Sequence, residues 1–150
     1  MTLPRELLKA ETITAMEANS YTHPLNPNAV RLTKNLGRTA GLTQMGMHLV
    51  TIMPGRDSTE YHVHHHEDEC IYILSGHGTA LLDGARYPVG PGDFIGCPRK
   101  GIAHAMSNTG SEPLVMLVAG THLEQEVCDY PLQKKRLFVS GADRAFVDLP

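Results

Sequence analysis

Short apolar runs, separated repeatedly by glycine, proline, asparagine or aspartate, make up the middle of this chain. Short runs rich in β-branched and aromatic residues predict strands, and the intervening small residues predict tight turns. The pair Asp83-Gly84, flanked by two such runs, predicts a two-residue hairpin. Many short strands with almost no helix predict an all-β fold, a double-sheet jelly roll. The expected strands cover residues 42–53, 59–64, 70–74, 78–82, 86–89, 93–97, 102–107 and 114–119.

The two ends of the chain carry weaker signals. Residues 3–10 predict a short helix, with Thr2 as its cap and Pro4 in its first turn. The prolines and asparagines of residues 19–28 predict an extended arm without regular structure. We expect the tail to pack along the outside of the barrel, where residues 143–149 add either a strand or one helical turn.

Length and charge exclude several classes of function. The chain has 150 residues, which is one domain's worth, and a domain of this size buries roughly 70% of its unfolded surface. The net charge is −3 and the only basic cluster, residues 134–136, is short, so we expect no nucleic-acid partner. No apolar stretch reaches membrane length and no signal-peptide layout opens the chain, so we expect no membrane partner and a cytoplasmic protein.

The cysteines do not indicate a disulfide framework. Cys70, Cys97 and Cys128 are odd in number and far apart in the chain. Cys70 and Cys97 fall in expected strands, so we expect them to be small core residues.

Histidines concentrate in the segment that begins at His62. Side chains alternate between the two faces of a strand, so His62 and His64 point the same way. After a short connection, Glu69 opens the next expected strand and faces both imidazoles. Two imidazoles and one carboxylate leave a divalent ion under-coordinated, and His104 is the candidate for a third imidazole.

Two spaced motifs in this chain resemble those of the cupin superfamily. The first motif has the form G, five residues, H-x-H, three or four residues, E, six residues, G; the second is G, five residues, P-x-G, two residues, H, three residues, N. This chain has one extra residue before the first histidine and one extra residue after the proline. The matching positions are Gly55, His62, His64, Glu69 and Gly76, then Gly92, Pro98, Gly101, His104 and Asn108.

The resemblance covers roughly residues 37–121 and implies a double-stranded β-helix, the jelly-roll barrel of cupins. Residues 1–36 would then form an N-terminal arm and residues 122–150 a C-terminal extension of a single domain. Within the superfamily, the chain looks like a group of uncharacterised bacterial single-domain cupins, some of which are labelled sugar-phosphate isomerases.

The types of the four expected ligands indicate which class of metal ion the site would bind. Three neutral imidazoles and one carboxylate suit one divalent transition metal (Fe, Mn, Ni, Zn or Cu) and leave one or two positions open. Pairing His64 with His66 also has strand spacing, but this pairing breaks the register to Glu69 and Gly76. We expect the remaining residues of this segment to be exposed: His65, His66, Glu67, Asp68 and His77.

The same alternation predicts the walls of the cavity beside the metal. The inner-face positions are expected to be mainly apolar, which is usual for a small-molecule site: Glu60, Ile71, Ile73, Ile102 and Met106. The first strand and its neighbour could add polar contacts from Gln44, Met45, Met47, His48 and Tyr61. The candidate binders of a substrate anion are Arg56, Arg86, Arg99 and Lys100.

These features predict a metal-dependent enzyme that acts on a small polar metabolite, such as a sugar derivative or a carbonyl compound. With iron the site would support a dioxygenase; with other metals it would support an isomerase or lyase, with Glu69 or a neighbouring base moving a proton. The alternative is a non-catalytic cupin that binds or senses a small molecule. We expect a homodimer, in which residues 19–35 lie on the partner subunit.

Overall fold

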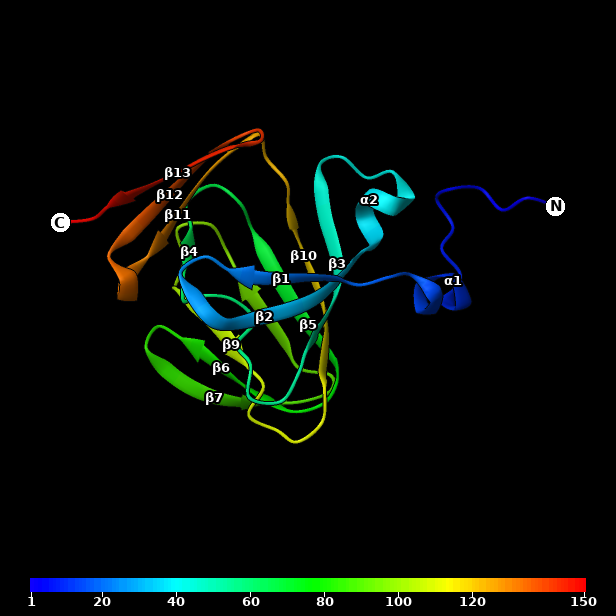
Figure 1. Cartoon of the computed structure of the whole chain (residues 1–150), viewed down its shortest axis with the longest axis horizontal. Helices are drawn as coiled ribbons and strands as arrows, with labels where there is room; N and C mark the ends of the chain where they lie inside the picture. The colour runs from blue at the N-terminus through cyan, green and yellow to red at the C-terminus, as the bar shows by residue number, and fades with distance from the viewer.

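The computed structural model describes all 150 residues, and antiparallel strands dominate it (Figure 1). The all-β prediction is confirmed, and each of the eight expected strands overlaps an observed one. In chain order the elements are α1 (Ala10–Ala15), β1 (Asn19–His23), β2 (Asn26–Asn35), α2 (Leu36–Ala40), β3 (Met45–Ile52), β4 (Val63–His64), β5 (Glu69–Ser75), β6 (Gly78–Leu82), β7 (Ala85–Val89), β8 (Phe94–Cys97), β9 (His104–Ser107), β10 (Leu114–Thr121), β11 (Gln125–Tyr130), a 3-10 turn (Pro131–Gln133), β12 (Lys135–Ser140) and β13 (Asp143–Asp148).

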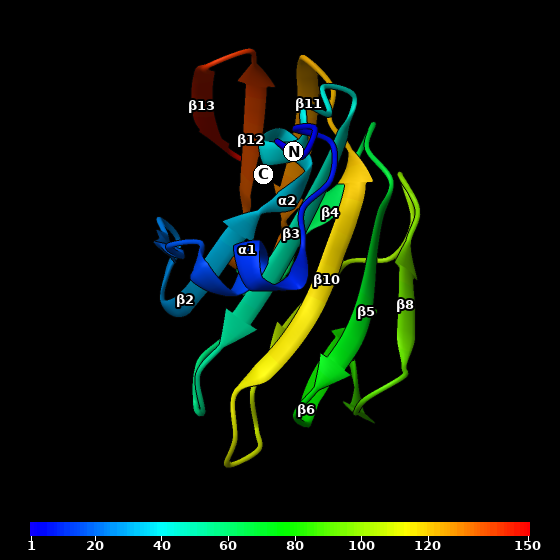
Figure 2. The same ribbon diagram turned by 90° about the vertical axis from the view of Figure 1, so that its right-hand side faces the viewer.

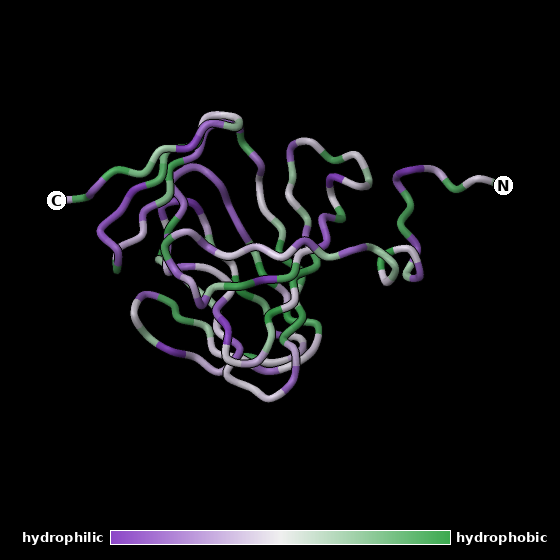
Figure 3. Tube along the Cα trace, in the orientation of Figure 1, coloured by the Kyte–Doolittle hydropathy of each residue, from purple (hydrophilic) through white to green (hydrophobic).

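Three sheets enclose the interior. The largest has the order β1-β2-β3-β10-β5-β8, and Figure 2 shows β3, β10, β5 and β8 side by side. The second has the order β7-β6-β9 and the third β13-β12-β11-β4. Hydrophobic and hydrophilic segments alternate over short distances along the chain (Figure 3), as expected for strands that bury one face.

The inner face of the largest sheet changes from apolar to polar along its strands. One row across β3, β10 and β5 contains the buried side chains Val50, Met116 and Ile73. Four positions further along β10, Gly120 pairs with Glu69, which opens β5. The apolar core therefore fills one end of the barrel, and the polar residues of the first motif lie at the other end.

Two motif residues have structural roles. Gly76 has φ +81°, and a Cβ there would lie 2.3 Å from the carbonyl oxygen of Pro113, so the turn requires glycine. The side chain of Asn108 is 1% exposed, and its amide donates to the carbonyl oxygens of Ile52 (2.7 Å) and Glu112 (2.8 Å). Asn108 thus ties β9 to β3 and to the loop before β10.

The N-terminal predictions were wrong. No helix forms over residues 3–9, because Arg5 turns toward the end of α2 and donates to the carbonyl oxygens of Arg38 and Thr39. Residues 19–28 are not irregular, since β1 and β2 form a hairpin that extends the largest sheet. Pro27 falls at the irregular end of this hairpin, before β2 meets β3, so its missing N–H removes no ladder bond.

The C-terminal segment forms strands that reach the first motif. Residues 143–148 form β13, which settles the alternative between strand and helical turn. Cys128 of β11 pairs with His64 of β4. All three cysteines are free; Cys97 and Cys128 are buried and Cys70 is half-buried. The division of one domain at residues 36 and 121 stays a prediction. None of the helices is long and apolar enough to cross a bilayer.

Candidate metal site

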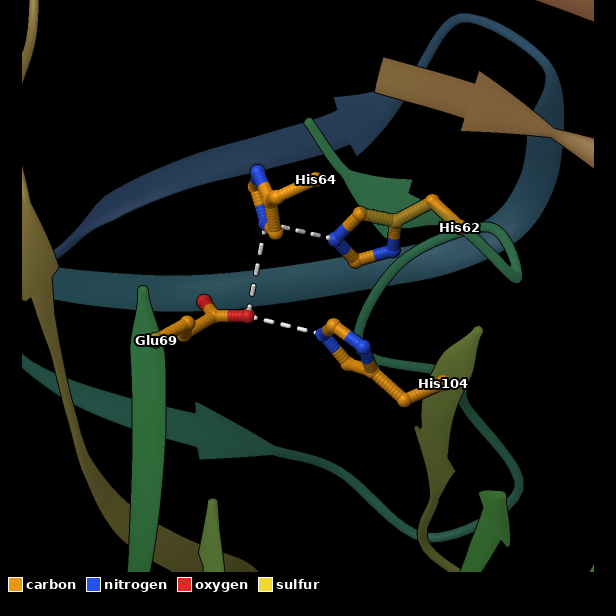
Figure 4. Close-up of side chains that lie close together, drawn as sticks. All are labelled: His62, His64, Glu69 and His104. Atoms are coloured by element: carbon orange, nitrogen blue, oxygen red, sulfur yellow. Dashed lines mark hydrogen bonds and ion pairs between the residues drawn. The ribbon is translucent and has the colours of Figure 1, made fainter. Parts of the chain in front are cut away.

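The structure brings His62, His64, Glu69 and His104 together, as Figure 4 shows. The backbones of His62 and His104 exchange two hydrogen bonds, of 3.1 and 2.8 Å, which places their imidazole rings 4.4 Å apart. His64 Nε2 lies 3.0 Å from His62 Nε2, and Glu69 Oε2 lies 2.8 Å from His104 Nε2. One donor atom from each of the four residues lies within 4.8 Å of every other.

Two of the three imidazoles have a partner on the side away from this centre. His62 Nδ1 lies 2.9 Å from the carbonyl oxygen of Glu60, which holds the proton on Nδ1 and leaves Nε2 free. His64 Nδ1 lies 3.4 Å from both Glu126 Oε2 and Cys128 Sγ. His104 Nδ1 is buried without a partner. The Nε2 atoms of His62 and His64 therefore face each other at hydrogen-bond distance, an arrangement that either one shared proton or a metal cation satisfies.

The electrostatics of the four residues also favour one positive charge at the centre. Burial and the neighbouring His104 lower the pKa of His62 to about 3. Burial acts to lower the pKa of His64, but hydrogen bonds to Cys128 and Glu69 raise it to about 11. Burial opposes ionisation of Glu69, yet contacts with His104 and His64 hold its pKa well below the usual range. Without an ion, protonated His64 carries this positive charge, and a divalent transition metal that displaced its proton would place positive charge at the same point.

Glu126 lies beside the candidate metal site, and the sequence did not predict this position. Its carboxylate is 5% exposed and accepts hydrogen bonds from the backbone N–H groups of His66, Glu67 and Val127 (2.9, 2.8 and 2.6 Å). Glu126, Cys128 and Tyr130 alternate along β11, all buried. That alternation is the same signal that identified His62 and His64, and it could have identified this second row.

A cavity of about 1140 Å³ opens beside the four residues. Ile71 and Met106 line it as expected, but Ile73 lies in the core and Ile102 is 42% exposed. Its wall is less apolar than expected, because the inner faces of β1, β2 and β3 add polar side chains. Gln44 and His48 are among the lining residues, as are Asn19, Thr33 and Asn35.

The cations expected near a substrate do not line this cavity. None of Arg56, Arg86, Arg99 and Lys100 is among the lining residues, whereas Arg31 and Arg144 are. Arg31 lies in the segment that was expected to be an arm, so its position inside a barrel could not be inferred.

The connection between the motif's histidines and Glu69 is only partly exposed. His66 and His77 are exposed as expected, and so is Asp68. His65 is half-buried, 3.0 Å from the carboxylate of Asp129. Glu67 lines the cavity and accepts a hydrogen bond from the N–H of Leu123 at 2.8 Å. The pairing of His64 with His66 is wrong, since His66 lies outside the group of four.

Comparison with known proteins identifies related chains. Residues 48–120 match the family model described as Cupin domain. A crystal structure from Acidithiobacillus ferrooxidans, of a proposed sugar phosphate isomerase, is 49% identical and superposes with a TM-score of 0.94 over 96% of this chain and 92% of that one. A sugar phosphate isomerase of the cupin superfamily from Silicibacter pomeroyi is 27% identical, with a TM-score of 0.83 over 95% and 92% of the two chains.

A curated relative gives a shorter match. An uncharacterized protein of Methanocaldococcus jannaschii is 35% identical over 80 residues, which are 53% of this chain. The chain spans about half the length of that relative, 56%.

Proposed function

Because this chain belongs to the cupin superfamily and has the jelly-roll barrel predicted from its motifs, we propose that it binds one divalent transition metal. His62, His64, Glu69 and His104 would hold this metal. The observation that carries the proposal is the meeting of three Nε2 atoms and one carboxylate oxygen at a single point of the cavity wall.

We further propose that the protein is an isomerase or lyase for a small sugar derivative or related carbonyl compound. Support comes from the relative of 49% identity, whose proposed activity is that of a sugar phosphate isomerase. Bound at this site, the metal would act as a Lewis acid on neighbouring hydroxyl and carbonyl oxygens. Glu69 is the proposed catalytic residue, because as a ligand it would touch the metal.

The residues around the candidate metal site have different proposed roles in binding, proton transfer and exclusion of water. The depressed pKa of Glu69 suits a ligand better than a base, because a carboxylate that strongly favours its charged form takes up a proton poorly. Glu67 and His122 are among the other titratable residues that line the cavity, and we propose that one of them moves the proton. Ile71, Met106 and Met116 line the cavity's apolar side, which excludes water from part of the site.

The test is proton exchange in heavy water. Metal-loaded protein is incubated with aldose and ketose phosphates, and deuterium at the carbon beside the carbonyl is followed by NMR, with oxygen uptake measured in parallel. We expect deuterium incorporation without oxygen uptake, and its loss in His104→Gln. Oxygen uptake would instead support the dioxygenase, and tight binding without exchange would support the non-catalytic binding or sensing cupin.

Assembly and location remain proposals. We propose a homodimer, because the outer face of the largest sheet exposes Tyr72, Leu74 and Phe94, which are 44%, 42% and 65% exposed. Sedimentation that showed only monomer at micromolar concentration would contradict it. We also propose a cytoplasmic location, which fractionation of the host cell would test.

A further inference from the structure

One wall of the cavity is polar over three neighbouring strands. The inner faces of β1, β2 and β3 present Asn19, Arg31, Thr33, Asn35 and His48 to the same cavity that the four proposed ligands line. On the same face of this sheet, the next strands β10 and β5 present the apolar side chains Met116, Val118 and Ile71. A cavity that is polar on one side and apolar on the other suits a ligand with several hydroxyl groups.

Arg31 is the charged group of this polar wall. Its guanidinium lies 4.8 Å from the centre of the Tyr21 ring and donates one hydrogen bond, to the carbonyl oxygen of Ser58 at 3.2 Å. It forms no ion pair, although it is half-buried. A guanidinium carries five N–H donors, so most of those on Arg31 remain available to a ligand.

The carboxylates of the cavity do not neutralise Arg31. Of the four glutamates that line the cavity, Glu69 contacts His104, Glu126 accepts three backbone N–H groups, Glu67 accepts the N–H of Leu123, and the exposed Glu124 forms no ion pair. Arg144 of β13 is the other permanently charged cation that lines the cavity, and it is exposed. Arg31 is therefore the half-buried positive charge of this cavity without a protein anion.

Two further polar atoms of the same wall lack partners. Thr33 Oγ1 and His48 Nδ1 are both buried without a hydrogen bond. Such groups are costly unless something satisfies them. The histidines nearby stay neutral: burial and the charge of Arg31 lower the pKa of His23 to about 4 and lower that of His48.

A row of rings connects Arg31 to the candidate metal site. Tyr130 stacks on the ligand His62 at 5.9 Å, His23 lies 5.1 Å from Tyr130, and Tyr21 lies 6.4 Å from His23. Arg31 is stacked beyond Tyr21. Arg31 and the candidate metal site therefore border the same cavity, with Tyr21, His23 and Tyr130 between them, so a chain-like ligand that passes these rings can contact both.

We propose that Arg31 binds the anionic end of the substrate, a phosphate or carboxylate, while the polar wall binds hydroxyl groups between it and the metal. The substrate class is then a polyhydroxylated carbon chain that carries an anion at the end remote from the reacting carbons. This assignment rests on the proposed function, because the metal site fixes the other end of the substrate. Arginine suits the role, since its planar donors match phosphate and carboxylate oxygens in pairs.

The test compares three six-carbon acids that differ at one end. Gluconate ends in a hydroxyl group, 6-phosphogluconate in a phosphate and glucarate in a carboxylate. Their binding to metal-loaded protein is measured by calorimetry, for the wild type, Arg31→Gln and Arg31→Lys. Arg86→Gln is the matched control, because Arg86 is exposed on β7 and does not line the cavity. Metal content and thermal unfolding are measured for every variant.

We expect the wild type to prefer at least one of the two terminal anions over gluconate by about 10- to 100-fold, since hydrogen bonds to charged groups are the strong ones. Which acid is preferred tells phosphate from carboxylate. Arg31→Gln should abolish this preference while metal content and gluconate binding stay unchanged, and Arg31→Lys should keep part of it. Arg86→Gln should behave like the wild type.

Three results would overturn the assignment: no preference in the wild type, a preference that survives in Arg31→Gln, or an equal loss of all three acids in Arg31→Gln. The last would show a structural role for Arg31. Failure of the proposed function gives a different result, because the wild type would then hold no metal. If metal-free protein still preferred a terminal anion and lost this preference in Arg31→Gln, the assignment of Arg31 as the anion-binding residue would hold.

Discussion

Replacement of Glu126 by glutamine removes a carboxylate that contacts the ligand His64 on the side of its ring away from the candidate metal site. Glu126 accepts three backbone N–H groups and faces His64 Nδ1. Glutamine has the same shape, but its amide has only one acceptor oxygen. If that oxygen keeps the two bonds made by Oε1, the NH₂ group faces the N–H of Glu67 and the ring of His64.

The magnitude follows from these contacts. One partly buried N–H, that of Glu67, loses its acceptor, and the N–H groups of His66 and Val127 exchange a charged acceptor for a neutral one, which costs about 2–4 kcal/mol of unfolding free energy. The NH₂ group also donates to His64 Nδ1, which moves the proton of His64 to Nε2. Because Nε2 is the proposed ligand atom, metal affinity should fall roughly 10- to 100-fold.

The assay is urea unfolding of metal-free protein, followed by competition of the loaded protein with a chelator. Glu124→Gln is the matched control, since Glu124 is exposed two positions earlier and its carboxylate forms no hydrogen bond. It should change neither quantity. If Glu126→Gln matched Glu124→Gln in both stability and metal affinity, the role given to Glu126 would be refuted.

Two further predictions concern His23 and Asn108. His23 has its pKa lowered to about 4 from 6.5, so the unfolded chain takes up a proton before the folded one and stability is lost as pH falls from 6.5 toward 4. Denaturant unfolding of metal-free His23→Gln across this range should show a shallower loss than the wild type; an identical loss would refute it. Asn108→Ala removes the partners of the buried Ile52 carbonyl and of two partly buried groups, the Glu112 carbonyl and the Gly110 N–H; it should cost about 2–4 kcal/mol in the same unfolding assay with metal content unchanged. A stable variant that lost its metal would contradict this.

The barrel strands could be predicted because the turns between them require particular residues. Gly76, for example, occupies a left-handed turn against Pro113, so the chain marks the end of β5 with glycine. The spacing of His62 and His64 likewise follows from the alternation of a strand, and the structure places both beside Glu69 and His104.

The parts that could not be predicted depend on contacts between distant segments. The hairpin of β1 and β2 contains prolines that argue against strands, and only its place at the edge of the sheet makes them tolerable. For this reason Arg31 was assigned to an arm. The helix expected over residues 3–10 fails because Arg5 contacts α2, a contact that local propensity does not contain.

Metal content of untagged protein and of single-ligand variants tests the central claim most directly. We predict about one transition metal per chain in the wild type, the loss of most of it in His104→Ala, and no change in His66→Ala, where an exposed histidine of the same segment is removed. A wild type purified and reconstituted without metal uptake, or a His104→Ala variant that kept its metal, would contradict the account.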